Sequence, residues 1–386
     1  MTEVRVNRKG ADRVASGHPW VFSSDVVERD HAAPGSVVKV LDPQRRPLGM
    51  AHYSSTSQIC LRLLSREIEE IGREFFARRI REAHDYRRQM VHDTDAYRVV
   101  HAEGDRLPAL VVDRYGDYLA IQTLDQGMDA AKEWILSALA DLFSPRGIVA
   151  RNDVPVRAHE QLPLETGVVF GEGPGELTVR INGLSFRADM LAGQKTGIFL
   201  DQRENYLAAA RYAHGKALDA FTSTGGFALH LAARCESVEA IDSSAAALAM
   251  AEANRVANGI GNVGFREADV FEILAGYSSA RREFSTVVLD PPAFAKNRRN
   301  LEGAARGYKE INLRALRLLG PGGILVTCSC SHHLSEAMLL QIVAEAALDA
   351  GRELRVLERR TQAQDHPILL TVPETHYLKC LVLQVV

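Results

Sequence analysis

Two glycines follow an apolar segment in the C-terminal half of the chain, where a ligand-binding turn is expected. Residues 216–221 are predicted to form a strand, and Gly225 and Gly226 stand at the expected start of a helix. Glycines there let the backbone approach a ligand closely and present N–H groups to it. The spacing differs from the G-x-G-x-x-G of dinucleotide sites, so it favours a carboxylate-bearing or nucleoside ligand. A purely structural turn is the alternative.

Acidic residues follow the next two predicted strands. Asp242 comes directly after residues 238–241, and an acid there can accept hydrogen bonds from both ribose hydroxyls. Asp269 lies after residues 263–265 and suits the exocyclic amine of adenine. Either acid alone can be a helix N-cap. Together with the glycine turn they predict an S-adenosylmethionine site, to which we also assign the neighbouring residues Phe221, Thr224, Ser243, Val270 and Phe271.

The fourth predicted strand, residues 286–289, ends in Asp290-Pro291-Pro292-Ala293-Phe294. Successive prolines make a rigid loop, which would fix Asp290 and nearby backbone carbonyls toward the ligand site. Such a loop suits recognition of the polar edge of a nucleobase. A plain turn is the alternative interpretation.

Two cysteines, Cys328 and Cys330, stand at the end of the fifth predicted strand, residues 324–328. A thiolate beside the methyl donor would attack carbon 6 of a pyrimidine and make carbon 5 nucleophilic. Carbon 5 would take the methyl group from the sulfonium, a base would remove the carbon-5 proton, and the thiolate would leave. Buried structural cysteines are the alternative.

The remaining cysteine pattern argues against a disulfide framework and against zinc. The chain has five cysteines, an odd number, and no C-x-x-C spacing. The C-x-C of residues 328–330 and the adjacent His332 and His333 lack a second ligand cluster, so we expect no metal site. A reducing cytoplasm is the expected compartment.

The segments that position these side chains alternate between short strands and helices from about residue 200 onward. Helices are expected over residues 226–234, 243–258 and 308–319. This alternation predicts an α/β domain with a doubly wound, mostly parallel sheet. Ligands of such sheets lie beyond the carboxyl ends of the strands, which is where the glycines, acids and cysteines stand. Residues 352–360 and 376–385 are expected to add an antiparallel pair.

The N-terminal half has a different pattern. Residues 1 to about 68 contain short β-branched runs between Pro and Gly turns, which predicts a small β barrel or sandwich. Residues 68–92 are predicted to form a helix whose arginines and glutamates form a solvated face. Residues 97–190 are expected to be α+β, with a hairpin at residues 115–117 and a helix over 129–143. Two later strands are expected to be joined by the turn at residues 171–175.

Length and composition set the outer bounds. The chain of 386 residues suggests two or three domains, and 46% hydrophobic with 25% charged residues is typical of a globular protein. No apolar stretch long enough for a transmembrane helix and no secretory signal is expected. The net charge of −3 argues against a strongly basic nucleic-acid binder, but residues 1–100 hold 17 Lys and Arg against 14 Asp and Glu. A nucleic-acid partner at the N-terminal end is therefore permitted.

Nearly the whole chain resembles the bacterial class I methyltransferases that make 5-methylcytosine in large-subunit (23S) ribosomal RNA and carry an N-terminal PUA domain. Residues 13–23, RVASGHPWVFS, resemble the start of the PUA domain, and residues 107–116, LPALVVDRYG, resemble the middle domain of the family. The most specific match is GQKTGIFLDQREN, residues 193–205. Residues 290–294, 306–309, 329–331 and 365–367 complete the resemblance.

The resemblance implies roles for particular residues. It carries the nucleophile to Cys330, although Cys328 lies in the Thr-Cys-Ser pattern of a broader group of RNA 5-methylcytosine enzymes. Many of that group have a second cysteine where this chain has Pro292, so one thiol must serve here. The block at 193–205 closes over the methyl donor in the family, which implies donor contacts for Lys195, Thr196, Gly197, Phe199, Asp201 and Arg203. For Arg203 an ion pair is the alternative.

The implied protein is a cytoplasmic, S-adenosylmethionine-dependent ribosomal RNA (cytosine-5) methyltransferase without a metal. Its expected parts are a PUA-like domain over 1–70, a middle α+β domain over 71–190 and a Rossmann-like class I methyltransferase domain over 191–386. The family often forms homodimers. Two other functions stay open: methylation of an exocyclic amine or other base nitrogen with the Asp-Pro-Pro-Ala-Phe loop, and a non-catalytic RNA-binding assembly factor.

Overall fold

The computed structural model describes residues 2–191, 193, 197–294 and 300–386, and the chain forms two compact units. The first unit comprises Met1–Ile181, Ala188–Leu200 and Gln364–Thr375. The second comprises Asn182–Arg187, Asp201–Ala363 and His376–Val386. A segment from late in the sequence therefore belongs to the first unit, although the residues on both sides of it belong to the second.

The N-terminal part of the first unit is a six-stranded sheet with the strand order β2-β6-β5-β4-β1-β3. Buried valines alternate with less buried residues along β1 and most of β4, whereas β6 is buried along nearly all of its length. Helix α1 (Arg8–Ala15), with Asn7 as its N-cap, packs on the same apolar core. The β-rich prediction is confirmed. The strands are β1 (Glu3–Val6), β2 (Trp20–Phe22), β3 (Val26–Glu28), β4 (Val37–Leu41), β5 (Pro47–Tyr53) and β6 (Ile59–Ser65).

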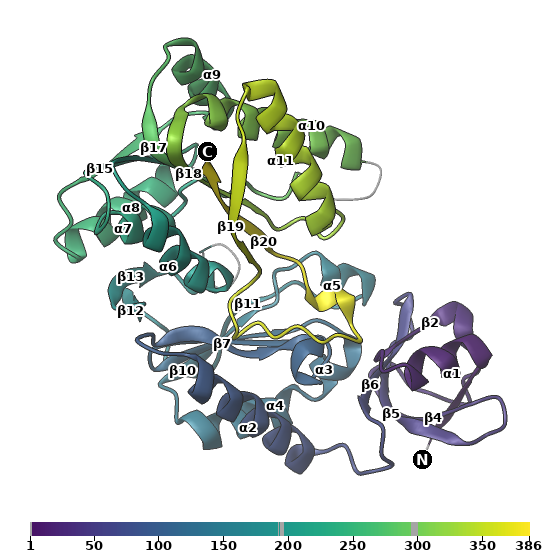
Figure 1. Ribbon diagram of the computed structural model, residues 1–386. Coiled ribbons are helices and arrows are strands. Elements are labelled where there is room, and N and C mark those ends of the chain that lie inside the picture. Colours follow the sequence, from purple (N-terminus) through teal and green to yellow (C-terminus); the bar gives the residue numbers. More distant parts are fainter. Residues whose placement is uncertain (1, 192, 194–196, 295–299) are drawn as a thin grey trace. The chain divides into compact units, whose positions relative to one another are not determined.

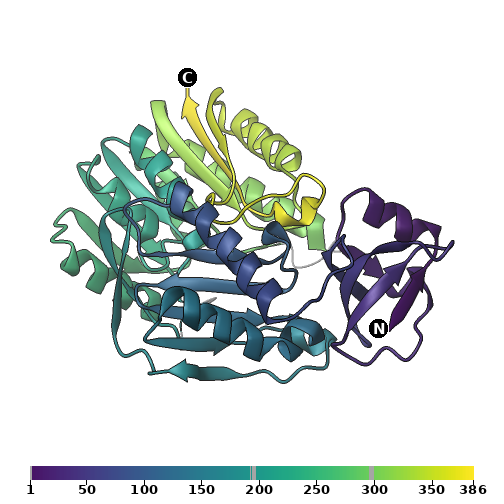
Figure 2. The same ribbon diagram turned by 90° about the horizontal axis from the view of Figure 1, so that it is seen from below.

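A five-stranded sheet with the order β11-β10-β9-β8-β7 forms the rest of the first unit. Helices α2 (Arg73–Met90) and α4 (Lys132–Phe143) lie side by side over one face of it (Figure 2). Their apolar side chains share a core with the sheet. The strands are β7 (Ala96–His101), β8 (Leu110–Tyr115), β9 (Tyr118–Thr123), β10 (Gly147–Arg151) and β11 (Thr166–Gly171), and the short helices are α3 (Gln126–Ala130) and α5 (Val156–His159).

The local predictions for this middle region are partly wrong. The helix expected from residue 68 begins only at Arg73, because the chain is extended at Gly72. The helix expected over 129–143 is divided into α3 and α4 at Ala131. Residues 171–175 do connect two strands, but these strands do not pair with each other, since β11 pairs with β10. The strand expected over 176–188 is instead a hairpin of β12 (Leu177–Ile181) and β13 (Leu184–Ala188), which turns at Asn182-Gly183, where both φ angles are positive.

The second unit is built on a seven-stranded sheet with the order β16-β15-β14-β17-β18-β20-β19. The first five strands of that order are parallel, and β20 is antiparallel to both of its neighbours. This confirms the predicted doubly wound α/β sheet with an antiparallel pair. The strands are β14 (Lys216–Ala220), β15 (Ser237–Asp242), β16 (Val263–Glu267), β17 (Phe284–Leu289), β18 (Leu319–Ser329), β19 (Leu354–Arg360) and β20 (Lys379–Val385).

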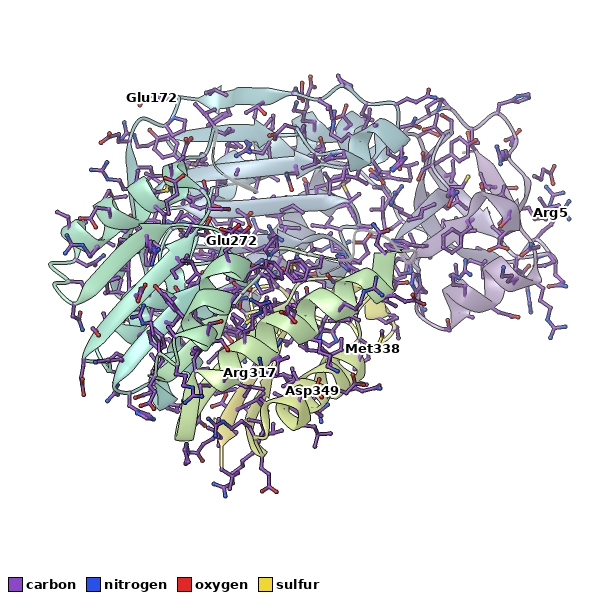
Figure 3. All side chains as sticks on the ribbon, turned by 90° about the horizontal axis from the view of Figure 1, so that it is seen from above. Arg5, Glu172, Glu272, Arg317, Met338 and Asp349 are labelled. Carbon is purple, nitrogen blue, oxygen red and sulfur yellow. The ribbon has the colours of Figure 1, made fainter. Side chains whose placement is uncertain are left out.

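Helices cover both faces of this sheet (Figure 1). Helices α9, α10 and α11 share one large apolar core with the strands. Helices α10 and α11 lie side by side, and Figure 3 labels Arg317 and Asp349 near their C-terminal ends. The helices are α6 (Arg203–Tyr212), α7 (Gly226–Leu231), α8 (Ala245–Ala257), α9 (Val270–Ser279), α10 (Leu301–Arg317) and α11 (Glu336–Ala350). Among the described residues, none of the helices has the length and apolar character needed to cross a membrane.

Candidate active site

The turn after β14 is organised by the buried carboxyl group of Asp219. Its Oδ2 accepts hydrogen bonds from the Thr222 hydroxyl at 2.6 Å and from the Ala228 N–H at 2.9 Å. Burial raises the pKa of Asp219 to about 7, although both hydrogen bonds act in the opposite direction. Sequence reasoning did not assign Asp219 to the site. An acidic residue inside an otherwise apolar predicted strand is the signal that would have found it.

The turn itself has an unusual backbone. Phe221 and Ser223 have φ angles of 68° and 50°, and Gly225 has φ of 86°. Non-glycine residues seldom adopt positive φ, and such conformations concentrate at ligand sites. Gly226 has a different reason to be glycine, because a Cβ there would lie 2.4 Å from the Tyr206 ring. Of the two predicted glycines, Gly225 therefore shapes the turn and Gly226 accommodates a packed aromatic ring.

Asp242 joins the first two loops at the carboxyl edge of the sheet. One carboxylate oxygen accepts the Ser223 N–H at 2.9 Å and the other accepts the Ser244 N–H at 2.9 Å. A carboxylate oxygen has more than one lone pair, so both oxygens can still accept ribose hydroxyls. Asp269 caps helix α9 by accepting the Glu272 N–H at 3.1 Å, and the same argument leaves it acceptor capacity for a ligand.

Asp290 is oriented by a chain of side-chain amides. Gln202 Nε2 donates to Asp290 Oδ1 at 2.9 Å, and Asn205 Nδ2 donates to Gln202 Oε1 at 2.7 Å. Arg360 Nε donates to Asn205 Oδ1 at 2.9 Å. Gln202 and Asn205 are buried, so their amides have few alternative partners. These two residues were not predicted individually, although they lie in the distinctive 193–205 block.

Aromatic rings line the same edge of the sheet. Phe221 and Phe271 meet edge to face with ring centres 6.5 Å apart, and Phe294 lies 5.9 Å from Phe271. Tyr308 continues the series at 4.7 Å from Phe294. The structure thus brings the predicted Phe221 and Phe271 together with the end of the Asp-Pro-Pro-Ala-Phe loop. Rings in such a row offer apolar faces and edges to a flat ligand.

The two candidate nucleophiles have opposite environments. Cys328 is completely buried and lies opposite Cys380 in the β18–β20 pair. Burial, reinforced by the Cys380 thiol, raises the pKa of Cys328 well above its usual range. Cys330 is the only one of the five cysteines that is not buried. The thiolate is the reactive form of cysteine, and burial disfavours it at Cys328. Cys330 is therefore the more accessible candidate nucleophile.

The neighbours of Cys330 are fixed by Tyr308. The Ser329 hydroxyl donates to the Tyr308 hydroxyl oxygen at 2.9 Å, and the Ser331 hydroxyl lies 3.3 Å from the same oxygen. Tyr308 is fully buried, and burial raises its pKa. The backbone on both sides of Cys330 is therefore held by one rigid side chain.

A lysine that sequence reasoning missed lies beside Cys330. Lys379, on β20, is opposite Ser329 and only 3% exposed. Its ammonium donates to the Ser331 carbonyl at 2.7 Å and to the Tyr377 carbonyl at 2.8 Å. Burial lowers the pKa of Lys379 to about 8, and attraction to Cys330 opposes that shift. A lone lysine in the apolar run 378–385 is the sequence signal that marks it.

The other residues predicted to contact the methyl donor lie in several different places. Asp201 is buried and accepts the Tyr377 hydroxyl at 2.7 Å, and Arg203 is buried with its guanidinium 3.3 Å from Glu204. Gly197 and Phe199 belong to the first unit. Lys195 and Thr196 lie outside the described residues. Thr224 and Ser243 lie in the first two loops, and Val270 begins α9.

The described arrangement provides acceptors for ribose and amine groups at Asp242 and Asp269, and an accessible thiol beside a buried ammonium. The residues therefore fit a nucleoside-bearing methyl donor and a base to be attacked. Among the described residues there is no group of three or more His, Cys, Asp or Glu side chains able to hold a metal ion.

Two segments of the chain match known families. Residues 4–66 match a family described as a PUA-like domain. Residues 160–383 match a family described as an S-adenosylmethionine-dependent methyltransferase, which covers more than half of the chain.

Full-length relatives are also found. The "Ribosomal RNA large subunit methyltransferase I" of Shewanella amazonensis is 44% identical over 377 residues, which is 95% of each chain. The protein of the same name from Erwinia tasmaniensis is 38% identical over 389 residues, 98% of each chain. A solved S-adenosylmethionine-dependent methyltransferase from Streptococcus mutans covers 100% of both chains with a TM-score of 0.83 at 18% identity, which shows a shared fold. A methyltransferase crystallised with SAH gives a TM-score of 0.84 at 19% identity, again over 100% of both chains.

Proposed function

The chain belongs to the family of the ribosomal RNA large subunit methyltransferases I, and on that premise we propose that it methylates carbon 5 of a cytosine in large-subunit ribosomal RNA. S-adenosylmethionine is its methyl donor and supplies an electrophilic methyl group. Asp242 and Asp269 would bind the ribose and adenine of the donor. The strained turn at Phe221 and Gly225 would approach the rest of that molecule closely.

Cys330 is proposed as the nucleophile. Its thiolate would form a bond to carbon 6 of the cytosine, which makes carbon 5 electron-rich enough to accept the methyl group. Loss of the carbon-5 proton to a base and cleavage of the carbon–sulfur bond would then restore the aromatic ring and the free thiolate. The observation that carries this proposal is the contrast between the two thiols, because Cys328 is fully buried and Cys330 is partly exposed.

Lys379 is proposed to stabilise the Cys330 thiolate. An ammonium has three N–H donors, and two of them bind the carbonyls of Ser331 and Tyr377. The third is available to the neighbouring sulfur. A cation beside a cysteine favours the thiolate over the thiol.

Asp290 is proposed to orient the cytosine. Its carboxylate is fixed by Gln202 and by the rigid proline loop, so it can accept a hydrogen bond from the exocyclic amine. Carbons 5 and 6 are inaccessible in a stacked helix, so the base must be unpaired or flipped. The PUA-like sheet and the middle region would hold the RNA mainly through phosphate and shape contacts. The domain boundaries, the homodimer and the cytoplasmic location stay predictions.

The experiment that tests this function compares Cys330→Ala with Cys328→Ala on ribosomal RNA from cells lacking the protein. We expect Cys330→Ala to abolish 5-methylcytosine formation and Cys328→Ala to retain most of it, measured by mass spectrometry of RNA digests. RNA containing 5-fluorocytosine should form a covalent adduct with the wild-type protein and with Cys328→Ala only.

The outcomes separate the alternatives. Full activity of Cys330→Ala would exclude the covalent mechanism through this thiol. Methylation of a base nitrogen by the wild-type protein would favour the amine methyltransferase, in which Asp290 alone orients the target. No methylation of any ribosomal RNA would favour a non-catalytic RNA-binding role.

A further inference from the structure

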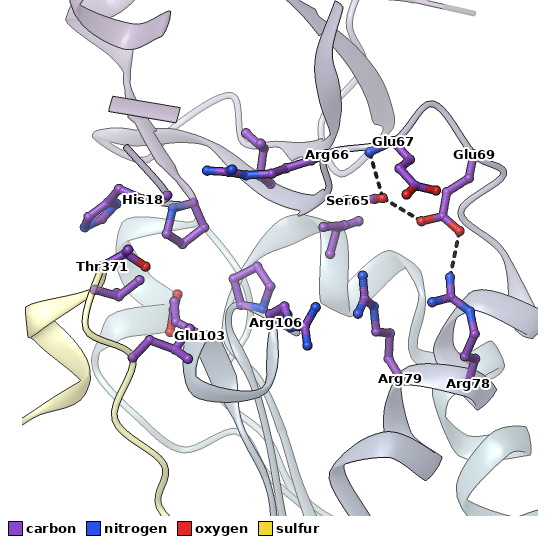
Figure 4. Close-up of a pocket in the computed structure, with 17 residues that line it drawn as sticks. His18, Ser65, Arg66, Glu67, Glu69, Arg78, Arg79, Glu103, Arg106 and Thr371 are labelled. Carbon is purple, nitrogen blue, oxygen red and sulfur yellow. Dashed lines mark hydrogen bonds and ion pairs between the residues drawn. The ribbon is translucent and has the colours of Figure 1, made fainter. Parts of the chain in front are cut away.

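A cavity of about 810 Å³ lies within the first unit. Its walls come from residues 17–19 after α1, from β6 and the residues that follow it, from α2, from residues 103–108 and from residues 369–372. The volume is within the range of ligand-binding pockets, roughly 300–1,000 Å³. Figure 4 shows Arg66 reaching over the cavity from the N-terminal sheet and Arg79 and Arg106 pointing toward it from the opposite side.

Arg79 is an unusual member of the predicted solvated face of α2. Its side chain is only about one-tenth exposed, an outer nitrogen pairs with Glu82 at 3.2 Å, and the guanidinium lies over the Phe75 ring at 5.3 Å from its centre. Its Nε is buried and has no hydrogen-bond partner among the described residues. Leaving a buried donor of a charged group unpaired is costly, so this guanidinium is expected to gain a partner when a ligand binds.

Arg106 presents a second guanidinium to the same cavity. It ends the turn Ala102–Asp105 with a left-handed backbone, φ 57°, which is held by its N–H bonding to the Glu103 carbonyl at 3.1 Å. The side chain is exposed, and within the described part of the chain it forms no hydrogen bond or ion pair. A rigid backbone therefore carries a guanidinium without an anionic partner.

The acids at the cavity wall are largely engaged with other groups. Glu69 accepts the Ser65 hydroxyl at 2.5 Å and pairs with Arg78 at 2.6 Å. Glu103 accepts the Trp20 indole N–H at 2.8 Å. Glu67 also lines the cavity, and within the described part of the chain its exposed carboxylate forms no ion pair. Four arginines thus face three glutamates in the cavity wall, and Arg79 and Arg106 have donors to spare. The missing component is an external anion.

We propose that this cavity binds the sugar–phosphate backbone of an unpaired RNA segment, with Arg79 and Arg106 on successive phosphates. This rests on the proposed function, which supplies the class of ligand. Guanidinium groups match phosphate oxygens in a fork geometry. The planar imidazole of His18 in the same wall offers a stacking face for a base, and Pro19 and Pro108 add apolar surface beside it. The cavity would therefore grip RNA at a distance in sequence from the cysteine that acts on it.

The test measures binding of a short fluorescein-labelled oligouridylate, which has no base pairs, by anisotropy at several salt concentrations. The variant Arg79→Met/Arg106→Met is compared with Arg81→Met/Arg88→Met, which loses the same two charges on exposed positions of α2 that do not line the cavity. We expect the cavity variant to bind at least about tenfold more weakly than the control variant. The slope of log affinity against log salt should fall by about 0.7 for each phosphate contact removed.

Equal affinities of the two double variants would overturn the proposal. Because Arg79 is buried, Arg106→Met alone is included, since its exposed side chain can be removed without disturbing the core. Its affinity should lie between those of the wild-type protein and the cavity variant. Photo-crosslinking of the wild-type protein with a 4-thiouridine oligonucleotide gives a second readout, in which crosslinks near residues 103–108 support the site and crosslinks confined to other segments contradict it.

Failure of this inference and failure of the proposed function give different results. If the wild-type protein methylates ribosomal RNA while the cavity variant binds and methylates like the control variant, only the cavity proposal fails. If no ribosomal RNA is methylated but the cavity variant alone loses oligonucleotide binding, the cavity proposal stands and the methylation proposal fails.

Discussion

Arg87 in the first unit and Asp219 in the second are equally buried, but only Arg87 is paired with an opposite charge among the described residues. The Arg87 guanidinium forms two hydrogen bonds with the Asp105 carboxylate, and it also donates to the Asp365 carbonyl at 2.7 Å. Among the described residues, only a hydroxyl and a backbone N–H donate to Asp219, and burial raises its pKa to about 7. One residue is a paired structural charge, and the other is a carboxyl group that burial pushes toward neutrality.

A second residue in each unit shows the same contrast. In the first, Arg98 pairs with the fully buried Asp113 at 2.7 Å. In the second, Lys379 is buried beside a thiol and two carbonyls, and its pKa is lowered. Paired charges hold a framework, whereas buried ionisable groups without an opposite charge cluster at sites where chemistry occurs. The comparison therefore separates the structural arginines from the candidate catalytic groups.

The largest expected effect comes from breaking the Arg87 pair. Arg87→Met should lower the free energy of unfolding by about 3–5 kcal/mol, because it leaves the Asp105 carboxylate without its cation. Urea-induced unfolding of the full-length chain measures this. Arg88→Met, one residue later and exposed, is the matched control and should stay within about 0.5 kcal/mol of the wild type. Similar losses for both variants would contradict the framework role.

Asp219→Asn tests the second unit. Because folding raises the pKa of Asp219 from 3.8 to about 7, the folded chain binds more protons between these values, and its stability falls as pH rises through about 7. Between pH 5 and pH 8, ionisation of Asp219 should lower the free energy of unfolding by roughly 2–3 kcal/mol. The amide cannot ionise, so Asp219→Asn should lose less stability over the same interval. An unchanged pH dependence in urea unfolding would refute the raised pKa.

Lys379→Met addresses reactivity rather than stability. Removal of the ammonium should shift the alkylation of Cys330 by iodoacetamide to higher pH and slow methyl transfer at pH 7 by about tenfold, the effect of one pKa unit. In the wild type this support should weaken above about pH 8, where Lys379 loses its charge. Mass spectrometry assigns the alkylated site, since the other four cysteines are buried. An unshifted profile would leave Lys379 a purely structural residue.

The smallest effect on the free energy of unfolding is expected for Arg73→Met. Arg73 pairs with Asp141 at 2.6 Å, but both side chains are more than half exposed. Solvent screens such a pair, so the free energy of unfolding should change by no more than about 0.5 kcal/mol. A loss comparable to that of Arg87→Met would remove the distinction between buried and exposed pairs.

The sequence was informative wherever chemistry depends on local position. Gly225, Asp242 and Asp290 stand at the carboxyl ends of β14, β15 and β17, which are neighbours in the sheet, so the α/β alternation alone brings them to one edge. Lys379 was missed because its place depends on the register of β20 against β18, which pairs it with Ser329. No local pattern records that register.

Other side chains were missed or misread for related reasons. Gln202 reaches Asp290 across 88 residues of sequence, and such a contact is set by packing rather than by periodicity. The α2 arginines look uniform in sequence, yet Arg87 is fully buried, Arg79 faces a cavity and Arg88 is exposed. The charge pattern of a helix shows which residues are polar but not what each of them meets.

The membership of residues 364–375 in the first unit has a consequence for synthesis. Ribosomes make proteins from the N-terminus, and N-terminal domains generally fold first. Here Arg87 must wait for Asp365, 278 residues later, to receive the last of its hydrogen-bond acceptors. The Arg98 N–H likewise waits for the Asp365 carboxylate, which accepts it at 2.9 Å. The first unit is thus still incomplete when most of the chain has emerged, and a nascent chain halted before residue 364 would expose these donors to chaperones and proteases.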